Sequence, residues 1–181
     1  MILASCGSAD SGAEGAETID STLVANGEPA INEKHFTATD LVDLDLSSYG
    51  IPVITKVPAG AQVLKYDVDG SISVFGGKFF KMNFKMMDGT VADNISMMLM
   101  MTTDAEMNPS FNAIEAQDDN GYLKSDKEGK LAFVHGVDVA GSSLIISDGM
   151  PYDISPDKFT DYTPEDIKLW YEAAKATDVK Q

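Results

Sequence analysis

Methionine has the most unusual distribution of any residue type in this chain. Eight of the ten methionines lie within residues 82–107. If residues 91–103 form a helix, Met97, Met100 and Met101 share its outward side, beside two aspartates. Thioether side chains fill apolar cores, form exposed contact surfaces, or bind soft Cu(I). The pattern therefore leaves three roles open for these methionines: core packing, a docking patch for a partner or apolar ligand, or a Cu(I) site.

Residue types that carry metal or acid–base chemistry are sparse and scattered. His35 and His135 are the only histidines, and neither has a cysteine, second histidine or carboxylate at zinc-ligand spacing. The acidic runs 67–70 and 118–121 supply too few oxygen ligands for a calcium loop and are typical of hairpin turns. No Gly-x-Ser-x-Gly motif is present. The sequence thus predicts no catalytic residue, no metal site and no cofactor.

Cys6 is the single cysteine and lies close to the N-terminus. It therefore has no partner for a disulfide within the chain. The residues after it, 7–17, are small, polar and acidic, and such a composition buries too little apolar surface to fold. We expect residues 1–36 to comprise the end of a signal peptide and a disordered acidic tether. Residues 37–181 then form a single domain.

The residues Leu3-Ala4-Ser5-Cys6 resemble the lipobox of bacterial lipoproteins. In that family the signal peptide is cut before the cysteine, which is then acylated with palmitate-type chains. The resemblance implies lipidation of Cys6 and anchoring in the bacterial cell envelope, at the outer membrane in preference to the inner one. Several acyl chains are needed, because one chain binds a membrane only marginally. Met1 to Leu3 is at most the end of an apolar h-region, so we expect the native signal peptide to be longer.

The chain is strongly acidic, with a formal net charge of −16, and its 13 basic residues are all lysines. This charge opposes binding to nucleic acid phosphates and to anionic lipid surfaces. The absence of arginine removes the bidentate fork that grips phosphates and carboxylates. The longest apolar run, residues 97–101, is too short to span a bilayer.

Alternating apolar and polar residues, bounded by glycine and proline turns, predict a series of short strands. The clearest is 80–86, where Phe80, Met82, Phe84 and Met86 alternate with polar residues. Residues 37–48 fit a helix and a strand equally well, and 148–161 are predicted to be irregular. The predicted strands cover residues 51–57, 63–66, 71–75, 80–86, 111–117, 122–124, 130–139 and 142–147.

Two helices are predicted between and after these strands. Residues 91–103 follow Thr90, which is placed to cap the helix. The second helix starts at Pro164, with Thr163 as its cap. Its buried stripe is Ile167, Trp170, Tyr171 and Ala174. These elements predict an α+β fold, with a mostly antiparallel β-sheet and about two packed α-helices.

The order of elements resembles the PsbP-like fold of the photosystem II extrinsic subunit and of small bacterial lipoproteins with a similar layout. The similarity covers about residues 48–177 and includes the corner Val57-Pro58-Ala59-Gly60, followed by a hairpin, a long strand, a helix, further strands and a final amphipathic helix. Such families are mostly accessory or assembly proteins without catalytic activity, which is what the resemblance implies for this chain.

These observations favour a non-catalytic envelope lipoprotein that acts as a binding or assembly accessory module. The expected partners are an envelope protein, through Met97, Met100 and Met101, and the membrane, through the N-terminal lipid anchor; nucleic acid is not expected. Two alternatives remain open. One is a hydrolase-like enzyme whose site is dispersed in the sequence, and the other is a methionine-rich Cu(I)-binding protein.

Overall fold

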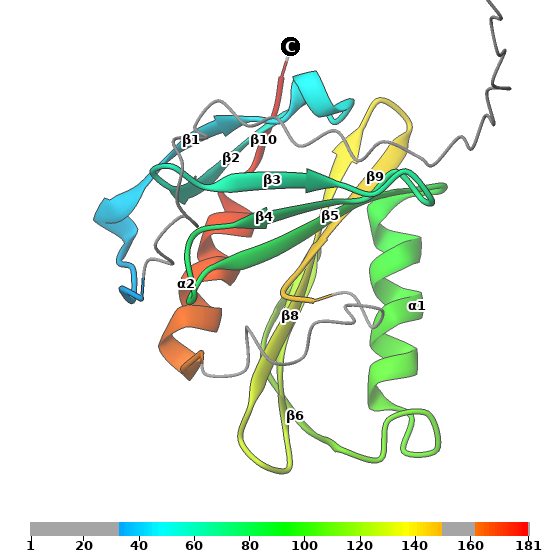
Figure 1. Cartoon of the computed structure of the whole chain (residues 1–181). Helices are drawn as coiled ribbons and strands as arrows, with labels where there is room; N and C mark the ends of the chain where they lie inside the picture. Colours follow the sequence, from blue (N-terminus) through cyan, green and yellow to red (C-terminus); the bar gives the residue numbers. More distant parts are fainter. Residues whose placement is uncertain (1–32, 150–161, 181) are drawn as a thin grey trace, which may run out of the picture.

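Two antiparallel β-sheets and two α-helices form the regular structure of the computed structural model, which describes residues 33–149 and 162–180 (Figure 1). The predicted α+β class is confirmed. Two short 3₁₀ helices, Ala38–Asp40 and Ser47–Tyr49, flank the first strand. The elements in chain order are β1 (Leu41–Asp45), β2 (Val53–Pro58), β3 (Gln62–Lys65), β4 (Ile72–Phe75), β5 (Lys81–Met87), α1 (Val91–Thr103), β6 (Phe111–Asp118), β7 (Gly121–Asp126), β8 (Leu131–Val139), β9 (Ser142–Ser147), α2 (Pro164–Lys175) and β10 (Asp178–Val179).

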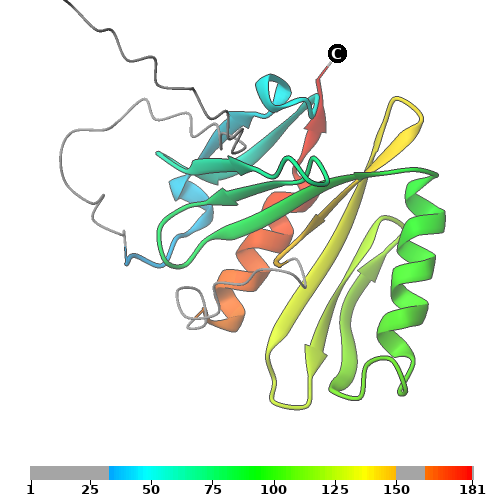
Figure 2. The ribbon, with the colours of Figure 1, turned by 45° about the vertical axis from the view of Figure 1, so that its right-hand side comes forward.

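The larger sheet has seven strands in the order β3-β4-β5-β9-β8-β7-β6, and all neighbours are antiparallel (Figure 2). The chain leaves the middle of this sheet after β5, passes through α1 and starts again at the far edge with β6. Three hairpins then bring β9 back against β5. α1 is therefore the connection between the two halves of the sheet.

The smaller sheet has the order β1-β2-β10, so β2 pairs with an early strand and with the C-terminal strand. Thr55 on β2 and Thr177, just before β10, share a buried hydrogen bond of 2.9 Å between their hydroxyls. The C-terminal end of the chain is thereby tied to the β1–β2 hairpin.

α2 covers one face of the larger sheet through the predicted stripe, and all four of its residues are buried. Trp170 lies fully buried at the centre, with its ring centroid 5.8 Å from that of Phe80. Its indole N–H donates a 3.2 Å hydrogen bond to the carbonyl of Phe79. The prediction for this helix is confirmed, including the cap in which Thr163 accepts the backbone N–H of Asp166.

α1 covers the opposite face of the same sheet. Ile145 on β9 packs with Val91 and Ile95 of α1. Its neighbours Leu144 and Ile146 belong to the larger hydrophobic core, which lies between α2 and the sheet. Adjacent residues of a strand point to opposite faces, so the two helices enclose the sheet from both sides. On β5 the polar residues Lys81 and Asn83 are buried like their apolar neighbours, and the amide oxygen of Asn83 accepts a hydrogen bond from the Ser73 hydroxyl.

The first described residues already pack on the domain. The ring of His35 stacks on Phe79 at 3.9 Å, and its Nδ1 lies 2.9 Å from the carboxylate of Asp166 at the start of α2. Phe36 meets the ring of Phe80 edge-on at 6.4 Å. The boundary predicted between residues 36 and 37 therefore cuts through packed chain. The remainder of the predicted tether, residues 1–32, and most of the irregular segment predicted at 148–161 lie outside the described residues.

Candidate functional site

α1 begins and ends where the sequence predicts it. The Thr90 hydroxyl accepts the backbone N–H of Asp93 at 3.1 Å and donates to its carboxylate at 2.8 Å. After the last helical residue, the Asp104 carboxylate accepts the backbone N–H groups of Glu106 and Met107 at 2.8 and 3.2 Å. These local contacts fix both ends of the helix.

Two buried polar contacts fix the rotation of α1 about its axis. The Asn94 amide donates to the carbonyl of Asp88 at 2.9 Å and to the hydroxyl of Ser143 at 2.7 Å. In the last turn of the helix, the hydroxyls of Thr102 and Tyr122 lie 3.0 Å apart. Because buried polar groups need partners, these bonds hold one side of the helix against the sheet and leave the other facing solvent.

The outward side of α1 carries the three methionines singled out in the sequence. Their exposed fractions are 42% for Met97, 64% for Met100 and 47% for Met101. Met98 and Leu99 pack against the smaller hydrophobic core, which lies between α1 and the sheet. The predicted orientation is confirmed, and these three side chains belong to neither hydrophobic core. We call them the methionine face. Whether it binds anything stays a prediction.

Carboxylates lie at both ends of the methionine face. At about 100° per residue, Asp93 and Asp104 fall on the same stripe of α1 as the three methionines. Both aspartates are exposed. Met107, which is 65% exposed, follows in the turn after the helix. The outer side of α1 is thus an apolar, polarisable strip with an anionic group at each end.

The two histidines have separate structural surroundings. His135 on β8 is buried, which lowers its pKa, and its Nδ1 has no hydrogen-bond partner among the described residues. The ring lies over Gly121 on β7, where a Cβ would come within 3.0 Å of that nitrogen. His35 is the residue paired with Asp166. Within residues 33–149 and 162–180, no three His, Cys, Asp or Glu side chains are grouped so that they could hold a metal ion. Cys6 lies outside those residues.

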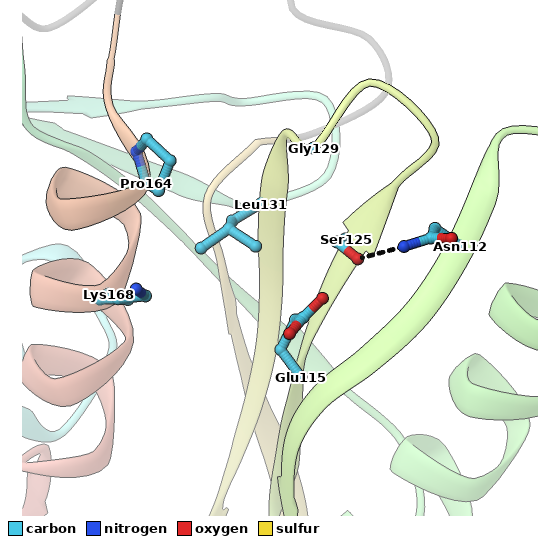
Figure 3. A pocket seen from close by; sticks show the side chains of 7 residues that line it. All are labelled: Asn112, Glu115, Ser125, Gly129, Leu131, Pro164 and Lys168. Atoms are coloured by element: carbon cyan, nitrogen blue, oxygen red, sulfur yellow. Dashed lines mark hydrogen bonds between the residues drawn. The ribbon is translucent and has the colours of Figure 1, made fainter.

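A surface pocket of about 250 Å³ lies between the start of α2 and strands β6 to β8 (Figure 3). Its walls are the Glu115 carboxylate, the Lys168 ammonium group and the apolar side chain of Leu131. The Asn112 amide donates a 3.2 Å hydrogen bond to the buried hydroxyl of Ser125. The remaining residues that line it are Gly129 and Pro164.

Two β-bulges create the polar side of this pocket. The pairing of β6 with β7 shifts by one residue at Asn112 and again at Glu115, so both are extra residues without a partner opposite. Bulges re-aim side chains, and here both turn toward the pocket. Sequence reasoning missed this site because a bulge depends on the register between two strands.

The carboxyl of Asp148, whose pKa is raised to about 6 by burial, is not among the residues that line this pocket.

No protein-family model matches the chain, and neither a curated protein nor a solved structure is similar to it. The resemblances to bacterial lipoproteins and to the PsbP-like fold therefore stay predictions. In the part of the chain that the structure describes, neither helix is long and apolar enough to cross a membrane.

Proposed function

We propose that the protein is an envelope lipoprotein, acylated at Cys6, whose domain is a non-catalytic binding or assembly module. The N-terminal segment links the lipid anchor to the domain, with the outer membrane as the favoured location. The domain presents the methionine face of α1 to a protein partner in the envelope. The lipobox resemblance supports the anchor, and the methionine face supports the binding role.

The observation that carries the binding role is the exposure of Met97, Met100 and Met101 on a helix whose rotation is fixed. Exposed thioethers are oxidised readily, so a soluble domain gains nothing from three of them side by side. Methionine is flexible and polarisable, and it recurs on surfaces that accept partners. Contiguous apolar groups at a surface mark interaction sites.

The lipid anchor is tested by expressing the gene with its complete native signal in the presence of radioactive palmitate. We expect the wild type to be labelled and to partition into detergent, and the Cys6→Ser variant to be unlabelled and soluble. Label in the variant, or a soluble wild type, contradicts the proposal.

The docking surface is tested with a photo-crosslinking residue placed at Met100 in cells. Val68, which is 99% exposed on the β3–β4 turn, is the matched control position. We expect one discrete product from position 100 and none from 68. Met97→Lys with Met101→Lys should abolish that product and leave the thermal midpoint nearly unchanged, because exposed substitutions alter stability little. Gross destabilisation by the pair, or an unaffected product, argues against the docking surface.

A Cu(I) site is the second candidate, because three thioethers at spacings i, i+3 and i+4 lie together on the outer side of one helix. Changing Met97, Met100 and Met101 to leucine separates the two functions, since leucine keeps the apolar surface but lacks sulfur. If this candidate holds, titration with Cu(I) against a competing chelator should show binding by the wild type and no binding by the leucine variant. The crosslink expected from position 100 does not depend on sulfur.

A further inference from the structure

The chain around α1 contains no basic residue over a long interval. Between Lys85 and Lys124 there is no lysine, arginine or histidine, although this interval includes all of α1 and β6. It contains seven acidic residues, and all seven are exposed. They are Asp88, Asp93, Asp104, Glu106, Glu115, Asp118 and Asp119.

None of these seven carboxylates takes part in an ion pair within the described residues. The carboxylates that do pair lie elsewhere, as in Asp43 with Lys56, Asp69 with Lys85 and Glu172 with Lys175. These ion pairs of the lysines thus involve acids outside the interval, although Lys127 lies beside it and donates a 2.7 Å hydrogen bond to the carbonyl of Pro109. Of the seven acids, Asp93 and Asp104 lie on the outer side of α1, whereas Glu115 lines the pocket beside α2. An uncompensated field of one sign attracts partners of the opposite sign and raises their rate of association.

Negative charge also lies at the C-terminal end of α1. Backbone carbonyls already make a helix C-terminus negative, so basic residues are favoured in the last turn. α1 has none there, and Asp104 and Glu106 follow immediately. Asp104 is explained by the turn that its carboxylate closes. The exposed Glu106 carboxylate makes no hydrogen bond or ion pair among the described residues, so its charge is available to a partner at this end.

The apolar strip and the carboxylates together define one kind of partner. Asp93 and Asp104 are about 16 Å apart along α1, because a helix rises 1.5 Å per residue. We propose that the methionine face binds a cationic amphipathic segment, with apolar side chains on the methionines and lysine or arginine residues opposite the carboxylates. This inference rests on the proposed docking function and specifies the chemistry of the partner.

The same charges disfavour the other possible occupants of this surface. A second copy of the chain carries a net charge of −16 and would bring its own acidic interval against this one. Anionic lipid headgroups and nucleic acid phosphates would also be repelled. A basic segment is the class of partner whose charge matches.

Fluorescence anisotropy with designed peptides tests the inference on the full-length chain. The probe is a peptide of about 16 residues, roughly four helical turns, with leucine at helical spacing and lysine at the other positions. A second peptide keeps the leucines and replaces each lysine with glutamate. We expect the lysine peptide to bind, with an affinity that falls as salt is raised, and the glutamate peptide not to bind.

Variants locate the binding on the protein. Asp104→Asn with Glu106→Gln should weaken the lysine peptide about threefold to tenfold. The control pair Asp67→Asn with Glu165→Gln removes the same charge from exposed positions away from α1 and should have little effect. Met97→Gln with Met101→Gln should weaken binding strongly, and Met86→Gln on β5 should not.

The outcomes separate this inference from the proposed function. Equal binding of both peptides, or loss in the methionine pair without loss in the Asp104 and Glu106 pair, overturns the cationic partner and leaves the docking surface standing. Equal weakening by the control pair shows attraction to net charge alone and also overturns it. If the lysine peptide fails to bind and the crosslink from Met100 is absent, the docking function fails as well.

Discussion

Trp170 is the largest side chain that the described fold buries completely, and it joins α2 to the sheet through its ring and its N–H group. We predict that Trp170→Ala destabilises the domain by about 3–5 kcal/mol, because it removes a whole aromatic side chain from a packed core. Trp170→Phe keeps a ring but leaves the Phe79 carbonyl without its donor, and should fall between alanine and wild type. Urea unfolding measures both; a loss below about 1 kcal/mol for alanine contradicts the packing described.

Asp148 gives the domain a specific pH dependence. Burial raises the pKa of its carboxyl to about 6, against the opposing effects of the Phe133 N–H and nearby lysines. The aspartate carboxyl of an unfolded chain has a pKa of about 3.9. Between these values the folded state binds the proton more tightly, so this group makes the domain less stable as pH rises from about 4 to about 6.

The Asp148→Asn variant isolates that contribution. Buried His135, whose pKa is lowered, has the opposite effect on stability and is common to both proteins. We expect the free energy of unfolding of the wild type, relative to the variant, to fall as pH rises through this window and to level off above it. A difference between the two proteins that does not change with pH would show that Asp148 is not titrating as described.

At the scale of elements, local signals predict both helices. Thr90 and Thr163 each cap a helix by accepting the backbone N–H of the residue three positions later. The buried stripe from Ile167 to Ala174 likewise lies within one segment. What could not be predicted depends on distant segments. The bulges at Asn112 and Glu115 exist only in register with β7, and the short strand β10 forms only because β2 has a free edge. The candidate pocket was therefore invisible in the sequence, whereas the methionine face was not.

The N-terminal boundary shows the same limit. Composition marks residues 1–36 as a tether, but His35 and Phe36 are held by Phe79, Phe80 and Asp166, all distant in sequence. We predict that deletion of residues 1–36 lowers the thermal midpoint by several degrees relative to deletion of residues 1–32, because about 1 kcal/mol moves it by a few degrees. Equal midpoints for the two truncations would mean that these contacts contribute nothing.

At the scale of the whole molecule, the larger hydrophobic core and the methionine face lie on opposite sides of the larger sheet. α1 and α2 lie on either side of the larger sheet (Figure 1). The larger hydrophobic core lies under α2 and the smaller sheet, and α1 adds a smaller core while its outer methionines stay exposed. Within the acidic interval, Asp93 and Asp104 lie on the outer side of α1, whereas Glu115 lines the pocket beside α2. The domain is thus asymmetric, with one face used for stability and the other available for contact. In the proposed function, this face is the one that the lipid-anchored protein offers to a partner near the membrane.

The most direct test of the docking surface is oxidation of the methionines by mild peroxide, in the purified protein and in intact native envelopes. In the purified protein, exposed Met97, Met100 and Met101 should oxidise well before buried Met82. In envelopes the bound partner should protect those three, while Met86, exposed on another element, oxidises at the same rate in both samples. Equal oxidation of the methionine face in both samples would contradict the account.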